Sequence, residues 1–154
     1  MRSVVALLVI LAAAACTPGS SAAPGAGAAP SNAQTVAVDV DLTNDPGGAT
    51  PAGAGGGYKP LVTTVAVGTF VRFTNSDGFA HTATSLAGAT FPSAYPFTSA
   101  ALQQSGATLS GGFSSGSLAA GASSQALLAD RAGTYLFGCF YHYGTPMRAV
   151  IVVH

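Results

Sequence analysis

Three residues with metal-binding side chains lie close together in one stretch of the sequence. Cys139, His142 and Met147 follow the pattern C-x2-H-x4-M and offer a thiolate, an imidazole and a thioether. Thiolate sulfur and imidazole nitrogen suit copper in both of its oxidation states, and a long, weak thioether contact completes a His2Cys site. The spacing therefore predicts that this stretch supplies most of the ligands of one copper ion.

Such a site needs a second histidine from elsewhere in the fold. The sequence contains three histidines in total. His81 lies on an expected strand that could neighbour the strand ending at Cys139 in a sandwich, so we predict that His81 supplies the remaining ligand. We expect no role for His154.

Each of these residues alone has an ordinary explanation. A free cysteine is a common core residue, and a lone methionine or histidine is more often a core or surface residue than a ligand. In an exported protein, Cys139 could also form a disulfide with Cys16, although each cysteine has a better separate use. Taken as a set in their strand context, the four residues favour copper.

The elements that must position these residues are short β-strands. Val36, Val38 and Val40 alternate with other residues, as expected for a strand buried on one face. Residues 44–57 are predicted to form a turn and a long glycine-rich loop, and most of 86–121 a loop with one short helix. Apolar, β-branched or aromatic runs predict further strands at 61–67, 69–75, 79–85, near 108–114, 123–129, 134–140 and 147–153. About seven or eight short strands predict an all-β fold, a Greek-key β-sandwich.

The N-terminal residues have the composition of an export signal. Arg2 is followed by the apolar stretch 3–15, which is too short to span a bilayer as a helix of about 20 residues. Cys16 comes directly after three alanines, as in bacterial lipoprotein signals, in which the cysteine is lipidated. Residues 17–34 carry no charge and are rich in Ala, Pro, Gly and Ser, which predicts a flexible tether. The expected organisation is a signal peptide at 1–15, a lipidated cysteine and tether at 16–34, and a folded copper-binding domain at 35–154.

We therefore expect an exported protein that a lipid at Cys16 anchors to the membrane of the cell envelope, on its periplasmic or extracellular face. The alternative is ordinary cleavage after an Ala-x-Ala site, which would leave a secreted protein.

Charge is scarce, with five Lys and Arg residues against five Asp and Glu residues. Without a basic surface to neutralise phosphates, nucleic-acid binding is not expected.

Three further motifs surround the candidate ligands. They are Gly68–Asn75 (GTFVRFTN), Gly78–Thr82 (GFAHT) and Gly133–Cys139 (GTYLFGC). Together with the C-x2-H-x4-M spacing they resemble the cupredoxin family, plastocyanin and its bacterial relatives in particular. The first two are similar to the family's strand before the first ligand loop and to its first-histidine segment, and the third leads into its second ligand loop. The resemblance covers residues 35–154.

The resemblance implies a type 1, or blue, copper site in which all four candidate residues are ligands: His81, Cys139 and His142 bind strongly and Met147 is axial. It also implies a single-electron carrier that alternates between Cu(I) and Cu(II), rather than an enzyme. Electrons in this family leave through the exposed loop histidine, which corresponds to His142 here.

Two residues beside His81 depart from the family pattern. Ala80 stands where the family usually has proline. Thr82 stands where it usually has asparagine or serine, whose side chain helps to pin the loop and polarise the cysteine sulfur. Both departures concern groups around the ligands, and such groups tune the reduction potential.

Copper storage or delivery at the cell envelope is the alternative function. A delivery protein more often offers an exposed, Met- or His-rich site, whereas only Met147 remains after the initiator methionine. Multicopper oxidases and nitrite reductases need further histidines, and three histidines cannot build their additional centres. A copper-free sandwich used for adhesion would leave the four-residue set without a purpose.

Redox proteins are expected to dock beside His142. Its neighbours Tyr141 and Tyr143 could either pack the loop or form part of the docking face, and the aromatic stretch 91–97 is expected to pack as a loop. Excluding Arg2, the chain has four basic residues against five acidic ones, with no run of like charge. We therefore expect a monomer that meets its partners through a small uncharged surface, with weak long-range steering.

Overall fold

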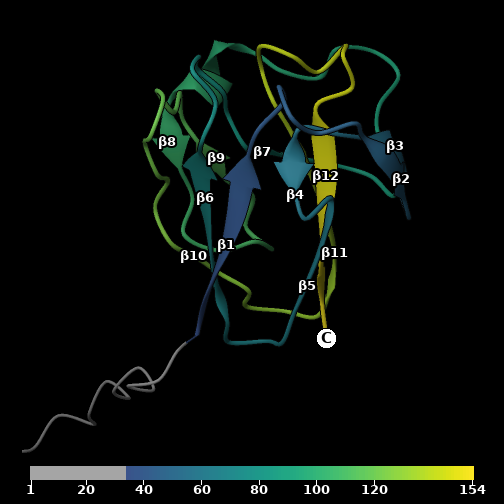
Figure 1. Ribbon diagram of the computed structural model, residues 1–154. Helices are drawn as coiled ribbons and strands as arrows, with labels where there is room; N and C mark the ends of the chain where they lie inside the picture. The colour runs from purple at the N-terminus through teal and green to yellow at the C-terminus, as the bar shows by residue number, and fades with distance from the viewer. Residues whose placement is uncertain (1–33) are drawn as a thin grey trace, which may run out of the picture.

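The computed structural model describes residues 34–154. The predicted signal peptide, Cys16 and nearly all of the predicted tether lie outside the described residues. Residues 34–154 form two larger β-sheets packed on each other and one small hairpin (Figure 1). This arrangement confirms the all-β sandwich predicted from the sequence.

Twelve strands are present between residues 34 and 154, and eight of them contain three or more residues. They are β1 (Thr35–Val40), β2 (Gly48–Thr50), β3 (Gly53–Gly55), β4 (Tyr58–Lys59), β5 (Val62–Val65), β6 (Phe70–Asn75), β7 (Thr84–Leu86), β8 (Gln104–Ser105), β9 (Ser114–Ser115), β10 (Leu127–Leu128), β11 (Gly133–Gly138) and β12 (Arg148–Val153), with a 3-10 helix, η1 (Ser99–Leu102), between β7 and β8. No helix in this described part of the chain is long and apolar enough to cross a membrane.

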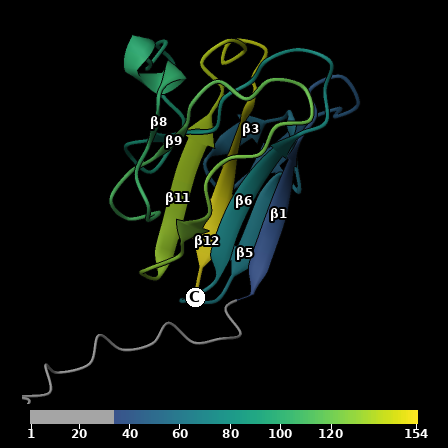
Figure 2. The same ribbon diagram turned by 90° about the vertical axis from the view of Figure 1, so that its left-hand side faces the viewer.

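The first sheet has the strand order β10-β6-β1-β4. The alternation predicted for β1 is confirmed, because Val38 and Val40 are fully buried and Ala37 is exposed. β1 runs parallel to β6 with Val38 opposite Phe73, so the two strands turn their apolar residues to the same face. Figure 2 shows β1 beside β6 and, in the other sheet, β11 beside β12.

The second sheet has the strand order β5-β12-β11-β7-β9-β8. β11 and β12 pair antiparallel over their whole length, from Gly133 opposite Val153 to Gly138 opposite Arg148. β12 is buried on both faces at most positions, in keeping with its nearly continuous apolar sequence. The two strands therefore hold the two ends of segment 139–147 side by side.

Aromatic side chains fill the centre of the core between the sheets. Tyr58, Phe73 and Phe137 are fully buried, with ring centroids between 4.8 and 6.3 Å apart. Burying one phenylalanine side chain is worth about 1.5–3 kcal/mol. Cys139 belongs to the same buried cluster, so the core that stabilises the sandwich also fixes the candidate ligand.

The loop predicted over residues 44–57 is wrong in part. β2 and β3 form a hairpin there, with Gly48 opposite Gly55 and with Gly53 at a φ of 122° near its turn. The sequence gives no strand signal because backbone hydrogen bonds hold this ladder without apolar alternation. A side chain at Gly55 would collide with the carbonyl oxygen of Arg148, so glycine lets the hairpin lie directly against β12.

The strand predicted over residues 79–85 is shorter than expected. β7 begins only at Thr84, and before it His81 forms a single bridge with Leu118. The side-chain amide of Asn75 donates hydrogen bonds to the carbonyl oxygens of Phe79 and Leu118. The Phe79 carbonyl oxygen therefore bonds to a side chain, and the Leu118 carbonyl oxygen is shared between this side chain and the His81 N–H of the bridge.

Segment 86–121 also differs in detail from its prediction. The short helix expected there is η1, which has only 4 residues. The strand expected near 108–114 is reduced to β9 at its C-terminal end, together with an isolated bridge between Thr108 and Leu128. Glycines at positive φ, such as Gly106 and Gly112, turn the backbone too sharply for a longer strand.

Candidate metal centre

The loop between β11 and β12, from which three of the candidate ligands come, lies at one end of the sandwich, at the top of Figure 1. Cys139 follows β11 directly, Met147 precedes β12 directly, and His142 lies in the loop between them. His81 comes from the separate segment between β6 and β7. The antiparallel pairing continues into the site, because the Cys139 N–H donates to the Met147 carbonyl oxygen at 3.0 Å.

Three of the four predicted ligands have their donor atoms together. Cys139 Sγ lies 3.7 Å from His81 Nδ1 and 3.8 Å from His142 Nδ1, and the two Nδ1 atoms are 3.2 Å apart. All three donor atoms fall within 4.8 Å of one another. The structure places His81 beside the Cys139 loop, across 58 residues of sequence.

Backbone hydrogen bonds shape the loop that carries His142. The His142 carbonyl oxygen accepts from the N–H groups of Thr145 and Met147, at 3.0 and 3.1 Å. The Thr145 hydroxyl donates to the same oxygen at 2.8 Å. These bonds fold residues 142–147 into a compact turn, which brings the imidazole back toward Cys139.

The donors differ in their exposure to solvent. Cys139 and His81 are fully buried, whereas His142 is half-buried. Burial raises the pKa of the Cys139 thiol, and nearby backbone N–H groups offset this only in part. Burial, together with the neighbouring His81, lowers the pKa of His142. The imidazole is thus held in the neutral form that metals bind, and a coordinated metal would deprotonate the thiol.

Met147 is joined to Cys139 by a backbone hydrogen bond and is buried in the same core. The side chain is fully buried and in the same core cluster as Cys139. It packs against Gly57, where φ is +76° and an added Cβ would collide with the Met147 side chain. The glycine-rich segment before β4 therefore shapes the space around the thioether, a role that the sequence did not reveal.

Thr82 connects the two segments that carry the ligands. Its backbone N–H points at Cys139 Sγ at 3.4 Å, and its hydroxyl oxygen accepts from the Phe140 N–H at 2.8 Å. Its carbonyl oxygen accepts from the buried Tyr58 hydroxyl. Thr82 thus joins the His81 segment to the cysteine loop, as the resemblance implies for asparagine or serine at this place.

Asp77 was not among the predicted site residues. Its Oδ2 lies 2.9 Å from His81 Nε2, on the side of the ring away from Cys139. Both side chains are almost fully excluded from solvent. The sequence offered one signal, a carboxylate four residues before the histidine, but Asp77 lies between the strands predicted over 69–75 and 79–85, and no local pattern there indicates where its side chain points.

Aromatic residues cover the ligand loop. The Tyr95 hydroxyl donates to the Phe140 carbonyl oxygen at 2.6 Å, and the Tyr143 hydroxyl donates to the Pro92 carbonyl oxygen at 2.8 Å. The prediction that stretch 91–97 packs as a loop is confirmed, and its packing partner is the ligand loop itself. The Arg148 guanidinium lies 5.1 Å from the ring centroids of both Phe91 and Tyr143, so a cation contacts two of these aromatic rings.

The two tyrosines beside His142 have different surroundings. Tyr143 is buried, with 4% of its surface exposed, and packs the loop. Tyr141 is 44% exposed, as is Phe79 on the other segment. The ring centroids of Phe79 and Tyr141 lie 5.4 and 6.2 Å from that of His142. His154 follows the far end of β12 and is distant in the fold from the ligand loop.

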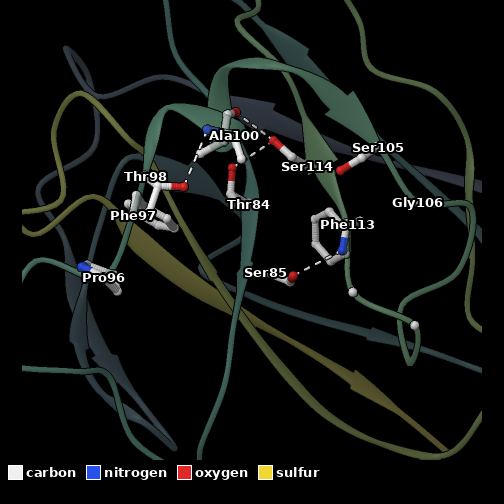
Figure 3. Close-up of a pocket in the computed structure, with 13 residues that line it drawn as sticks. Thr84, Ser85, Pro96, Phe97, Thr98, Ala100, Ser105, Gly106, Phe113 and Ser114 are labelled. Carbon is white, nitrogen blue, oxygen red and sulfur yellow. Dashed lines mark hydrogen bonds between the residues drawn. The ribbon is translucent and has the colours of Figure 1, made fainter.

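A separate hollow of about 480 Å³ lies between segment 96–101 and β9 (Figure 3). Two of its hydroxyl groups pair with each other, because Thr84 Oγ1 pairs with Ser114 Oγ, which donates to the Ala101 carbonyl oxygen. None of the residues that line it is charged, a histidine or a cysteine. The hollow therefore shares no donor with the metal centre and offers little chemistry of its own.

No protein-family model matches this chain, and no curated protein matches it. Among solved structures it is similar to a purple cupredoxin from Nitrosopumilus maritimus, with 20% identity over 77% of this chain and 98% of the other and a TM-score of 0.47. A mutant plastocyanin of a fern gives 19% identity over 77% and 100% of the chains, with a TM-score of 0.47. A Cu(I) structure of an amicyanin mutant gives 16% identity over 78% and 82%, with a TM-score of 0.48. Likenesses at this level do not assign a function.

Proposed function

We propose that this protein is a single-electron carrier built around one type 1 copper ion. His81, Cys139 and His142 are the strong ligands and Met147 is the axial ligand. The observation that carries this proposal is the convergence of one thiol and two imidazoles, from separate segments, within 4.8 Å. A thiolate with two imidazoles is a donor set that suits copper.

Burial of the site favours electron transfer over storage or delivery. When bound, copper supplies the exchange between Cu(II) and Cu(I). The chain's own part is to hold the donors in place in both states, and the core packing around Cys139 and His81 supports this. A delivery protein must release its ion, yet here two of the three converging donors have no exposed surface.

The test is the visible absorption spectrum of the purified protein with Cu(II), followed by voltammetry. An intense band from thiolate-to-copper charge transfer and a reversible one-electron wave are expected. Cys139→Ser should abolish the band, because the thiolate is its source. His154→Ala is the matched control, a histidine outside the site, and should keep it. An intense band that survives Cys139→Ser would overturn the assignment.

We further propose that redox proteins dock over His142. It is the half-buried donor of the converging set, and exposed aromatic rings of Phe79 and Tyr141 flank it. Such a surface is uncharged and fits a small, transient contact. The rate of electron transfer from a reduced partner should therefore change more when Tyr141 is substituted than when a distant charged residue is substituted.

Export and lipid anchoring remain proposals supported by the sequence alone. The apolar stretch 3–15 followed directly by Cys16 motivates them. Mass spectrometry of the membrane fraction should find an acylated N-terminus at Cys16. Recovery of only unmodified protein beginning at or after Cys16 would reject the anchor.

A further inference from the structure

A buried carboxylate lies directly behind His81. Asp77 is 5% exposed, and its Oδ2 receives three hydrogen bonds. The Leu42 N–H donates to it at 2.7 Å and the Thr43 N–H at 3.3 Å, and His81 Nε2 lies 2.9 Å away. The Asp77 N–H donates to the Asn75 side chain at 3.0 Å, which fixes the turn that carries the carboxylate.

The two nitrogens of His81 consequently have separate roles. Nδ1 faces Cys139 Sγ and His142 Nδ1, while Nε2 faces Asp77. A carboxylate on Nε2 holds the proton on that nitrogen and leaves a lone pair on Nδ1, directed at the metal position. Such carboxylate–histidine pairs fix the ring and raise the basicity of the ligating nitrogen.

We propose that Asp77 is a positioning residue for the copper site, which orients His81 and lowers the reduction potential by favouring Cu(II) over Cu(I). This inference rests on the proposed copper function. The physical reason is charge: a buried anion beyond the imidazole stabilises the ion of higher charge more, because the interior screens it poorly.

Asp77 keeps its negative charge despite its burial. The N–H groups of Leu42 and Thr43 and the Nε2 atom of His81 all lie within hydrogen-bond distance of Oδ2, and donors directed at a carboxylate oxygen favour its charged form. Between residues 34 and 154 the other side-chain ion pair joins Asp41 to Lys59, at 2.7 Å. That pair is internally balanced, so the charge of Asp77 acts on His81 without a neighbouring lysine or arginine partner.

Asp77→Asn separates the effect of charge from that of hydrogen bonding. All three bonds to the Asp77 side chain end on Oδ2. An asparagine with its carbonyl oxygen in that place can accept all three while carrying no charge. The variant should therefore fold, and any change at the metal reports the lost anion.

The expected effect is a loss of Cu(II) affinity of about 10- to 100-fold, the usual cost of removing a partner behind a metal-bound histidine. Cu(I) affinity should fall less. Each tenfold difference between the two losses corresponds to a rise in potential of about 59 mV for a one-electron couple. The control is Asp39→Asn, which removes the same charge from the half-buried β1 residue opposite Lys59.

The experiment measures Cu(II) and Cu(I) affinities and the midpoint potential of wild type, Asp77→Asn and Asp39→Asn. A higher potential and weaker Cu(II) binding in Asp77→Asn alone supports the inference. Equal copper affinities and equal midpoint potentials in all three proteins, together with a normal blue band, would reject the role of Asp77 and leave the proposed function intact. A wild type without the band would reject the proposed function, and the inference with it.

Nitrogen NMR of the metal-free protein gives a second readout. The spectrum is recorded at pH 8. The His81 ring should then carry its proton on Nε2 in both wild type and Asp77→Asn. A proton on Nδ1 would show that Asp77 does not determine which nitrogen of the His81 ring is protonated, whatever the reduction potentials of the variants are.

Discussion

Replacing Thr82 by valine is expected to weaken the junction between the two ligand segments. Thr82 is fully buried, and its hydroxyl oxygen accepts the Phe140 N–H at 2.8 Å. Valine has nearly the same shape but offers a methyl group in place of that oxygen. The N–H beside Cys139 would lose its partner, and a methyl carbon cannot approach a nitrogen so closely without repulsion.

The expected loss of stability in Thr82→Val follows from one hydrogen-bond donor, the Phe140 N–H, that is left without a partner. Leaving a buried polar group unpaired costs about 1–3 kcal/mol. For a domain of this length, that corresponds to a fall in Tm of roughly 4–12 °C. Far-UV circular dichroism of the metal-free protein would measure it, so that copper binding does not mask the loss.

Thr82→Ser is the matched control, because it keeps the hydroxyl oxygen and removes only a methyl group. Its Tm should lie much closer to that of wild type than the Tm of Thr82→Val does. The blue band should survive in both variants, since the bond to Cys139 Sγ comes from the Thr82 backbone. Equal stability of wild type and Thr82→Val, or equal damage in the two variants, would refute this reasoning.

Three further predictions concern the axial ligand, acid stability and docking. Met147→Leu should keep the blue colour but raise the potential, because an electron-donating contact to Cu(II) is lost; an unchanged potential in voltammetry would mean that Met147 is not axial. Hydrogen bonds from Ser110 lower the pKa of Asp130, so their stabilisation is present above the unfolded carboxyl pKa of about 3.9 and is lost as pH falls through the lower folded value. Ser110→Ala should therefore destabilise the protein in urea at pH 7 and much less at pH 2, and a loss of equal size at both pH values would contradict this. Electron-transfer rates with a partner should change less than about threefold between 10 and 300 mM salt, because few charges surround the docking face. Tyr141→Glu beside His142 should slow transfer with little change in the copper spectrum; a steep salt dependence in wild type would show that the partner binds charges elsewhere.

Much of the fold was predictable where the strands bury one face. Alternation along β1 predicted the buried Val38 and Val40, and the apolar run 147–153 predicted the strand that the structure shows as β12. The glycine-rich hairpin of β2 and β3 was not predictable in this way. Its pairing depends on backbone bonds and on close approach to β12, and neither leaves a periodic pattern in the side chains.

The sequence determined which residues could form the site, because their chemistry is local. Cys139, His142 and Met147 lie within one short segment, so their spacing alone indicated a common metal, and His81 followed from the small number of histidines. The tertiary structure decided how these residues are held. The hydrogen bonds of Thr82 and Asp77 and the packing of Gly57 against Met147 join segments far apart in sequence. Such contacts depend on the direction of each loop, which the packing of the two sheets sets and no local pattern encodes.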